Sequence, residues 1–300
     1  MQGKGYDERT LKTLQAILLK MLEDFDALCE RHGIDYFIVG GTALGAVRHG
    51  GMIPWDDDID VGMNREAYDA FQRVRDPAFN DRYVLLNPET DSRCPFPSTR
   101  WQLRGTVFRE TCYRDVPLPL GIFLDVYCFD RIPDDPAAMR RQAWTAWGWG
   151  KLFVLRQVKQ PALYFGGARA AVARLGCQLG HAVLAGLHVS PRALYRQASA
   201  AARRHRADAA GRIAFLFDPR PFTSMVRVED IYPTRRIEFH GMRVKGPNRI
   251  EAYLSRRYGD YLRVPPVNQR HQHPPQELDF GPYAAAGDNR PEASPCVQQG

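Results

Sequence analysis

The sequence lacks several features that define whole classes of protein. None of its six cysteines forms a Cys-x-x-Cys pair, which excludes a zinc site or disulfide framework of the usual spacing and fits thiols kept reduced in the cytosol. No run approaches the roughly 20 apolar residues of a membrane-spanning helix. The start, MQGKGYDERT, has no apolar signal core, and Gln2 stands where myristoylation requires glycine. We therefore expect a cytoplasmic protein and leave open a peripheral attachment to the inner face of the cytoplasmic membrane.

Acidic residues are nearly absent from one long segment. Residues 139–212 contain thirteen Lys or Arg and a single acid, Asp208, whereas the remaining chain carries a net charge of −5. A solvated basic face on surface helices is the ordinary interpretation. The alternative, which we favour, is a dock for an anionic membrane or a lipid-linked glycan, because aromatic side chains lie among the cations, as in Trp144, Trp147 and Trp149. Nucleic acid is not an expected partner, since the acidic remainder would repel its backbone.

What is present is the composition of a folded chain. Its 300 residues are 44% hydrophobic and 25% charged, which is enough for one large domain. Helical periodicity and short extended runs alternate before several consecutive strands, so we predict an α/β fold with a mixed sheet flanked by helices. We expect a single domain over residues 1–273, with a basic helical insertion at about 136–212. Residues 274–300, rich in Pro, Ala and Gln, are predicted to be an unpaired tail.

The boundaries of the predicted elements follow from periodicity and capping residues. Thr42 is expected to cap a short helix, and Asn64 another. The expected helices cover 8–31, 42–48, 65–74 and 249–258, besides the helical insertion. The expected strands lie at 36–39, 83–86, 99–103, 106–109, 121–129, 235–239 and 242–244.

The strongest chemical signal is the segment DDDID at 56–60. Side chains alternate along a strand, so Asp58 and Asp60 share one face while Ile59 and Val61 point into the core. Two carboxylates about 4 Å apart repel by about 4 kcal/mol at an effective dielectric of ~20, which favours a bridging cation. Oxygen ligands without a nearby His or Cys favour Mg²⁺ or Mn²⁺. A polar turn, a helix cap or a calcium loop are the other interpretations, although the spaced ligands and closing Glu of a calcium loop are missing.

Two further patterns add to this signal. The predicted strand ending at Gly40, Gly41 and Thr42 opens a helix, and bare N–H groups at a helix N-terminus can hold a phosphate. The apolar run GIFLDVYCFD at 121–130 contains Asp125, whose charge is costly to bury unless it is paired or bound to a metal. An edge strand with Asp125 in water is the alternative, and Asp130 is expected to cap the following turn.

These motifs resemble those of the LicD family, which includes the fukutin-related proteins. The resemblance covers GGTALGAVRHGGMIPWDDDIDVGM (40–63), RWQLRGTVFRE (100–110), GIFLDVYCFD (121–130) and residues 237–273. It implies a nucleotidyltransferase-like fold, whose glycine pair, paired aspartates and third aspartate fall on Gly40 with Gly41, Asp58 with Asp60, and Asp125. The sequence departs mildly from the family pattern at Gly50, His240 and the Tyr127-Cys128 pair. These departures leave the metal carboxylates intact, and they bear on the expected donor and acceptor selectivity.

The resemblance implies a metal-dependent transferase of substituted phosphate groups. Such an enzyme moves phosphocholine, ribitol phosphate or a similar phospho-alcohol from a CDP-linked donor onto a sugar of a glycan such as lipopolysaccharide, and it releases CMP. CDP-choline is the expected donor, and a glycan or lipid-linked glycan is the expected acceptor. Asp58 and Asp60 would hold Mg²⁺ or Mn²⁺, while Asp125 would complete a second metal position or accept the proton of the attacking hydroxyl.

Other side chains are weaker candidates for contacts with the donor. Arg48 and Arg104 are expected to bind its phosphates, because a guanidinium group fits phosphate oxygens, although each could instead be a surface arginine. Trp55 could stack on the base or simply anchor its loop. Three histidines are further candidates that could equally be solvated: His49, His271 and His273.

Three alternative functions remain open. A glycosyltransferase would use Asp58 and Asp60 as an Asp-x-Asp metal site but has no use for the glycine turn or for Asp125. A nucleotidyltransferase acting on ATP or CTP would release pyrophosphate. A non-catalytic relative could recruit nucleic acid through its basic insertion, although three intact aspartates argue against it.

Overall fold

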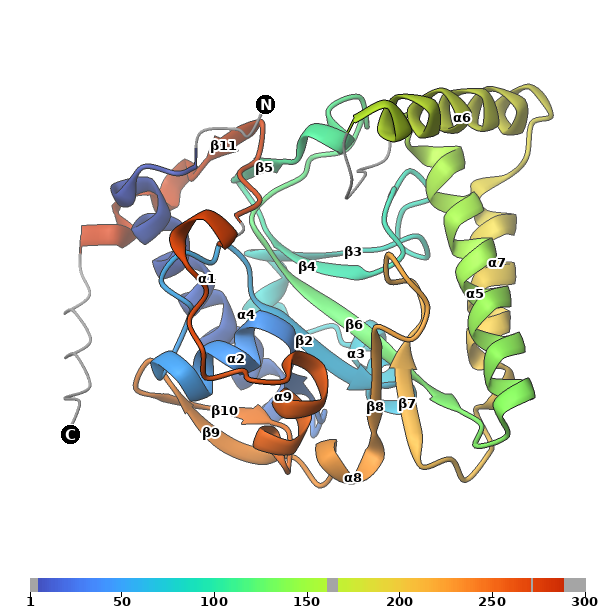
Figure 1. Cartoon of the computed structure of the whole chain (residues 1–300). Coiled ribbons are helices and arrows are strands. Elements are labelled where there is room, and N and C mark those ends of the chain that lie inside the picture. The colour runs from blue at the N-terminus through green and yellow to red at the C-terminus, as the bar shows by residue number, and fades with distance from the viewer. Residues whose placement is uncertain (1–4, 161–166, 271, 289–300) are drawn as a thin grey trace.

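The computed structural model describes residues 5–160, 167–270 and 272–288, and it shows a curved mixed sheet with helices around it (Figure 1). The central strands follow the spatial order β1, β2, β6, β4, β3, and they span Phe37–Ile38, Asp60–Asn64, Phe123–Ile132, Thr99–Leu103 and Tyr83–Leu86. β2 runs parallel to β6, and the other pairs of this set are antiparallel. The α/β class predicted from the sequence is confirmed.

The long strand β6 joins two parts of the sheet. Its first half lies between β2 and β4, while its end pairs with β7 (Arg212–Phe215), which in turn pairs with β8 (Ser224–Arg227). Neither β7 nor β8 was expected, because four residues beside a helical and basic segment contain too few alternations to indicate a strand. The chain therefore returns to the central sheet directly after the helical insertion.

Helix α1 (Glu8–Arg31) has the predicted bounds, and its apolar stripe forms much of the main core. The other helices beside the sheet are α2 (Gly40–His49), α3 (Arg65–Arg73), the short α4 (Pro77–Asn80) and α9 (Ile250–Tyr258). The predicted cap of α3 is confirmed, since Asn64 Oδ1 accepts the N–H of Ala67 at 2.8 Å.

The prediction that Thr42 caps its helix is wrong. Helix α2 begins two residues earlier, at Gly40, after an extended Val39 that provides no side-chain cap. Gly40 adopts a φ of 57°, in the region that favours glycine, and this sharp turn starts the helix. The Thr42 hydroxyl instead accepts the N–H of Asp60 at 2.9 Å, and it thereby ties α2 to the start of β2.

Asp130 is structural, as expected, but it holds a helix rather than capping a turn. Its two carboxylate oxygens accept hydrogen bonds from Nε and an Nη of Arg65, at 2.8 and 2.7 Å, and both side chains are buried. Arg65 begins α3, and Asp130 lies on β6. The pair therefore fixes α3 to the central sheet through two charge-assisted hydrogen bonds.

The predicted helical insertion consists of α5 (Pro136–Gln157), α6 (Gly167–Gly186) and α7 (Pro191–Ala202), which we call the helical arm. α5 and α7 lie side by side, and small residues fill their contact, including Ala143, Ala146 and Ala198 (Figure 1). α6 lies across one end of this pair at the edge of the molecule. A one-turn segment, η2 (Arg203–His205), leads from α7 towards β7.

No single helix among the described residues has the length and apolar character to cross a membrane. Two helical stretches, Arg169–Gly186 and Pro191–His205, meet those criteria only when taken together, and they are bent by 109° at the break between them.

The expectation that everything after residue 274 is unpaired is wrong for the described part. β11 (Glu277–Asp279) pairs with β5 (Val107–Arg109), and η4 (Gly281–Asp288) packs against α1. Phe280 and Tyr283 contact the main core, which explains why this polar-looking segment is held. Residues 289–300 lie outside the described part of the chain.

The remaining elements complete the end of the sheet near α9. The expected hairpin is confirmed as β9 (Arg235–Phe239) and β10 (Met242–Gly246). Its turn residues, His240 and Gly241, have φ angles of 51° and 75°. The three other short helical segments are η1 (Thr111–Tyr113), α8 (Val228–Ile231) and η3 (Val267–Gln269).

Candidate active site

The three predicted aspartates lie near one another where β2 begins beside β6, although their oxygen atoms do not all come within 4.8 Å of one another. The parallel register places Asp60 directly opposite Asp125, and the N–H of Asp125 donates to the carbonyl of Ile59 at 3.1 Å. Ile59 and Val61 are fully buried in the core. The alternation of the strand therefore turns Asp58 and Asp60 to the opposite face, where Asp125 also points.

The local environment disfavours negative charge on these carboxylates. Burial raises the pKa of Asp58, and the charges of Asp56 and Asp57 raise it further. Burial and the charges of Asp58 and Asp125 raise the pKa of Asp60 in the same way. Burial also raises the pKa of Asp125, although a neighbouring arginine opposes it. Without a cation, this end of the sheet is a site of stored electrostatic repulsion.

One oxygen of this group has no partner. Oδ1 of Asp60 is buried and makes no hydrogen bond within the described residues. A buried carboxylate oxygen normally has a hydrogen-bond donor or a cation beside it. The orphaned oxygen, together with the hard oxygen ligands around it, fits a divalent cation such as Mg²⁺ or Mn²⁺.

The N-terminus of α2 lies directly against the carboxylates. A Cβ added at Gly40 would be 3.1 Å from Oδ2 of Asp60, and one added at Gly41 would be 2.7 Å from Oδ2 of Asp56. The N–H of Gly40 donates to the hydroxyl of Tyr253 at 3.0 Å. The amides of Gly41 and Thr42 belong to the first turn, whose N–H groups have no partner within a helix. They are the two amides of the predicted glycine motif that could donate to a bound phosphate.

The structure adds Arg100, which the sequence interpretation missed. Arg100 lies opposite Asp125 on β4, and its Nε is 3.8 Å from Oδ1 of Asp125. Its two terminal nitrogens donate to the two oxygens of Glu110, both at 2.7 Å. Ser98 donates to the same Oδ1 of Asp125 at 3.1 Å. Arg100 is the second residue of β4, which is buried along its whole length. A buried positive charge requires a partner, so an arginine in a predicted strand was the signal that the sequence offered.

Of the two arginines predicted to bind phosphate, Arg104 lies beyond the carboxylates, and Arg48 is close enough to the acidic cluster for its charge to interact with that of Asp56. Arg104 lies just after the end of β4, four residues beyond Arg100, and its Nε donates to the carbonyls of Asn80 and Tyr83. Arg48 lies in the last turn of α2, roughly 12 Å along the helix from Gly40. One Nη of Arg48 donates to the carbonyls of residues 261 and 263, at 3.3 and 3.2 Å.

The candidates around Trp55 hold a loop together. The guanidinium of Arg270 lies 4.0 Å from the centre of the Trp55 ring, and His49 meets the same ring edge-on at 5.9 Å. Burial lowers the pKa of His49, and the positive charge of Arg48 lowers it further. Trp55 is therefore placed as a loop anchor, and the face under Arg270 is already covered.

His273 does reach the carboxylate cluster. Its backbone N–H donates to Oδ2 of Asp57 at 2.9 Å, and its Nδ1 lies 3.6 Å from the other oxygen. This contact with Asp57 raises the pKa of His273 to about 9. Single ligand atoms of Asp57, Asp58 and His273 lie within 4.8 Å of one another, close enough to hold one ion. Asp57 was not singled out from the sequence, and His271 lies outside the described residues.

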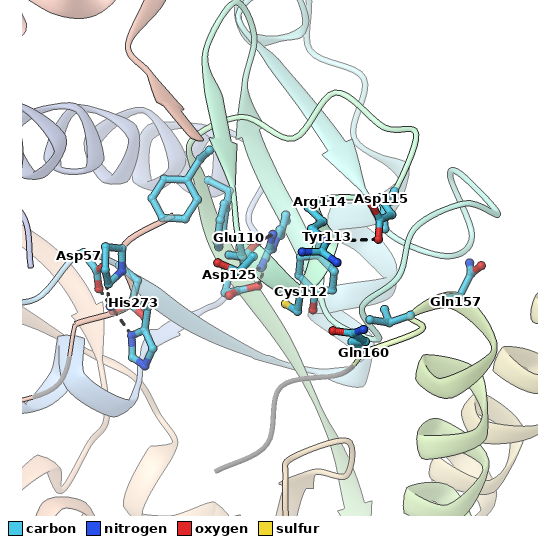
Figure 2. A pocket seen from close by; sticks show the side chains of 18 of the residues that line it. Asp57, Glu110, Cys112, Tyr113, Arg114, Asp115, Asp125, Gln157, Gln160 and His273 are labelled. Atoms are coloured by element: carbon cyan, nitrogen blue, oxygen red, sulfur yellow. Dashed lines mark hydrogen bonds and ion pairs between the residues drawn. The ribbon is translucent and has the colours of Figure 1, made fainter. Parts of the chain in front are cut away.

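A cavity of about 810 Å³ extends from the carboxylates to the helical arm. Asp57, Asp125 and His273 lie towards one end, while Gln157 and Gln160 lie towards the other (Figure 2). The segment around η1 lies between them. The arm contributes amide and basic side chains to the cavity lining, namely Gln157, Lys159, Gln160, Arg174 and His181. The basic insertion therefore faces the candidate site as well as the solvent.

Gly50 and His240, two of the expected departures from the family pattern, contact each other. The N–H of His240 donates to the carbonyl of Gly50 at 2.7 Å, which joins the β9–β10 turn to the loop after α2. This contact lies at the C-terminal end of α2, away from the carboxylates.

Comparisons with known proteins give the same family as the sequence motifs. Residues 33–92 match the family model described as the LicD/FKTN/FKRP nucleotidyltransferase domain. The chain is 37% identical over 129 residues to the lipopolysaccharide cholinephosphotransferase LicD of Haemophilus influenzae, a segment that covers 42% of this chain and 47% of that protein. It is 44% identical over 46 residues to the human ribitol 5-phosphate transferase FKRP, which covers 15% of this chain and 9% of that protein.

A further relative is an uncharacterized protein of Rickettsia typhi, which is 44% identical over 73 residues, 24% of this chain and 23% of that protein. The matched segments thus cover about half of the Haemophilus protein and smaller shares of the others. The resemblance found in the sequence motifs is confirmed over residues 33–92, which include Gly40, Gly41, Asp58 and Asp60 and match the model of the LicD/FKTN/FKRP nucleotidyltransferase domain.

Proposed function

We propose that this chain is a metal-dependent phosphotransferase that moves phosphocholine, or a related phospho-alcohol such as ribitol phosphate, from a CDP-linked donor onto a sugar of a cell-surface glycan. The observation that carries the proposal is the register that sets Asp60 beside Asp125, next to Asp58 and the first turn of α2. The names of two relatives, one a cholinephosphotransferase and one a ribitol 5-phosphate transferase, support a phospho-alcohol as the transferred group.

The carboxylates fit a divalent cation. Asp58 and Asp60 would hold Mg²⁺ or Mn²⁺ through oxygen atoms, which are the ligands these ions prefer, and Asp125 would either complete a second metal position or accept a proton. The unpartnered Oδ1 of Asp60 and the raised pKa values of the carboxylates support a cation at this position. When bound, the ion neutralises charge on the donor pyrophosphate and on the departing phosphate.

The chain's own groups would align the donor and activate the acceptor. The free amides of Gly41 and Thr42 would donate to an oxygen of the donor pyrophosphate, where the positive end of the α2 dipole favours negative charge. Asp125 is the candidate base, because Ser98 and Arg100 fix its orientation and burial raises its pKa and so its basicity. Its carboxylate would accept the proton of the acceptor hydroxyl.

The transfer is a single displacement at phosphorus. The acceptor oxygen forms a bond to the phosphorus distal to cytidine, and the bond between that phosphorus and the bridging oxygen breaks. CMP leaves with the bridging oxygen, and the phospho-alcohol remains on the sugar. A cavity of about 810 Å³ falls within the range of roughly 300–1,000 Å³ usual for small-molecule sites.

The first test is the melting temperature of the purified chain with Mg²⁺ and single nucleotides. The panel contains CDP-choline, CDP-ribitol, CDP-glycerol, CTP, ATP and a UDP-sugar. A ligand that binds only the folded state raises the melting temperature by mass action. We expect a metal-dependent increase with one CDP-alcohol, lost in Asp58→Asn and Asp60→Asn. Asp260→Asn is the matched control, because Asp260 is exposed and does not line the cavity.

The products of the reaction distinguish the alternatives. CMP released together with a phospho-alcohol on the glycan supports the proposal, whereas pyrophosphate indicates nucleotidyl transfer and a nucleoside diphosphate indicates glycosyl transfer. Turnover retained in Asp58→Asn would place the metal elsewhere. A melting temperature unchanged by every nucleotide would contradict the proposal and favour a binding role.

A further inference from the structure

Helix α6 exposes its apolar side chains instead of burying them. Five large apolar residues, four on this helix and one directly after its end, are between 57% and 73% exposed: Val172, Leu175, Leu179, Val183 and Leu187. They are spaced by three or four residues, so they form one continuous stripe along the helix. Monomeric proteins rarely leave a contiguous apolar surface of this kind without a partner.

The opposite face of α6 is the one that packs on the protein. His181 lies within hydrogen-bond distance of the carbonyl of Leu155, with its Nδ1 at 2.9 Å. A Cβ added at Gly180 would lie 2.9 Å from a methyl group of Leu155, so the helices approach closely there. α7 behaves in the usual way, because Leu194 and Tyr195 are buried against Phe153 of α5. The exposed stripe is thus particular to α6, at the edge of the molecule (Figure 1).

The charge around the stripe identifies the partner. The sequence contains no Asp or Glu from residue 136 to residue 207, and the arm carries exposed cations at Arg169 on α6 and at Arg192 at the start of α7. A second copy of this chain is a poor partner, because a symmetric contact would bring the same cations of two arms together. An anionic lipid surface offers apolar depth for the stripe and negative charge for the flanking arginines. We propose that α6 docks the chain on an anionic bilayer, with its apolar stripe in the interfacial layer.

Trp147 and Trp149 of α5 pack on the protein, whereas Trp144 is 53% exposed beside them. The indole N–H of Trp147 donates to the carbonyls of Asp218 and Pro219, at 3.1 and 3.3 Å. Trp144 packs edge-on against Trp147, and Trp149 packs on the cluster around Phe153. The tryptophan cluster therefore supports the fold of the arm, and the apolar contact with lipid belongs to α6.

The position of α6 relates the bilayer to the cavity. Arg174 and His181 of this helix line the cavity, on the side away from the stripe. A bilayer in contact with the stripe would therefore lie about one helix diameter, roughly 10 Å, from the cavity wall. Lipid binding by the stripe and transfer at the carboxylates can be tested independently, because the two regions are not in contact.

The test is sedimentation of the full chain with lipid vesicles. The vesicles contain phosphatidylcholine alone or phosphatidylcholine mixed with phosphatidylglycerol, at low and high salt. We expect binding to the anionic vesicles at low salt that weakens as salt screens the arginines. The triple variant Leu175→Gln/Leu179→Gln/Val183→Gln should lower the partition coefficient at least about tenfold, since it removes apolar surface from the contact.

A matched control carries the same kind of change on another exposed apolar patch. Leu262→Gln/Val264→Gln/Val267→Gln replaces three exposed side chains outside the arm, and it should bind vesicles as the unaltered chain does. The proposal is wrong if the unaltered chain ignores anionic vesicles at low salt, or if both triple variants bind equally well. A third outcome would also contradict the proposal. In it, neither the unaltered chain nor either variant binds lipid, and the unaltered chain forms a dimer that only the α6 variant abolishes.

Discussion

The carboxylate end of the sheet and helix α6 depart from the usual distribution of side chains in opposite directions. At the start of β2, acidic groups lie half-buried or buried beside one another, and burial raises the pKa of several of them. On α6 and directly after its end, five large apolar side chains lie in solvent. A protein tolerates either arrangement when something outside the chain compensates for it, a cation in one region and an apolar surface in the other.

The buried pair of Arg65 and Asp130 shows how the sheet accommodates charge without a ligand. Arg65→Met should cost about 3 to 5 kcal/mol of the free energy of unfolding, because Asp130 is left buried without a countercharge. Urea denaturation measures the loss. The double variant Arg65→Met/Asp130→Leu should recover much of the stability, and a single variant as stable as the unaltered chain would show that the pair contributes little.

The acidic cluster should behave in the opposite way, since its charges are uncompensated without metal. Burial and the charge of Asp57 raise the pKa of Asp56 from 3.8 to about 6. Folding therefore favours the protonated form, and the stabilising contribution present below about pH 4 is lost as the pH rises through about 6. The free energy of unfolding of Asp56→Asn, relative to that of the unaltered chain, should therefore rise by about 2 kcal/mol as the pH rises from about 4 to about 7.

Urea denaturation in a metal chelator at each pH measures this difference. Asp260→Asn, at an exposed position, should show a stability relative to the unaltered chain that barely changes with pH. A constant difference for Asp56→Asn would mean that Asp56 is not strained by its neighbours.

Gly40 tests whether the site depends on the close approach of α2. Gly40→Ala and Gly33→Ala should each lose about 1 to 2 kcal/mol, because both glycines have a φ near 60°. Only Gly40→Ala places a methyl group 3.1 Å from Asp60, since the space beside Gly33 is open. Turnover should fall about tenfold or more in Gly40→Ala alone, measured as CMP release at a temperature where both variants are folded. Equal turnover in the two variants would contradict the proposed role of this turn.

The stripe on α6 should have the smallest effect on stability. Leu179→Ala is expected to change the free energy of unfolding by no more than about 0.5 kcal/mol, because its side chain is already in water. Leu194→Ala, from the buried face of α7, should destabilise the chain far more. Thermal unfolding of both variants checks the contrast, and a large loss in Leu179→Ala would show that the stripe is packed against the protein.

Elements with a clear local pattern could be predicted. Helix α1 and strands β3 and β4 have the expected bounds, because their periodicity and capping residues are local. Strands β7 and β8 and the late strand β11 were missed, since each is three or four residues long, and β7 and β11 are held by partners far away in the sequence. Helix α2 begins earlier than expected because Gly40 turns the backbone before Thr42.

The residues of the candidate site also fall into those with a local sequence pattern and those placed by distant contacts. Asp58, Asp60, Asp125 and the glycine pair could be chosen from the sequence, because the alternation of a strand and the spacing of a motif are visible there. Arg104 was chosen from the sequence in place of Arg100, because a sequence does not give the register of the strand that contains Arg100. Only the register of β4 against β6 sets Arg100 beside Asp125 and leaves Arg104 beyond the site.

The sequence by itself determined the α/β class, the resemblance to the LicD family and the concentration of basic residues in one segment, because composition and local periodicity are properties of neighbouring residues. The tertiary structure decided which charges meet and which apolar side chains remain exposed. Strand register paired Asp60 with Asp125, and the packing of α6 through His181 and Gly180 left its leucines in solvent. Both depend on contacts between segments far apart in the chain, which no local pattern specifies.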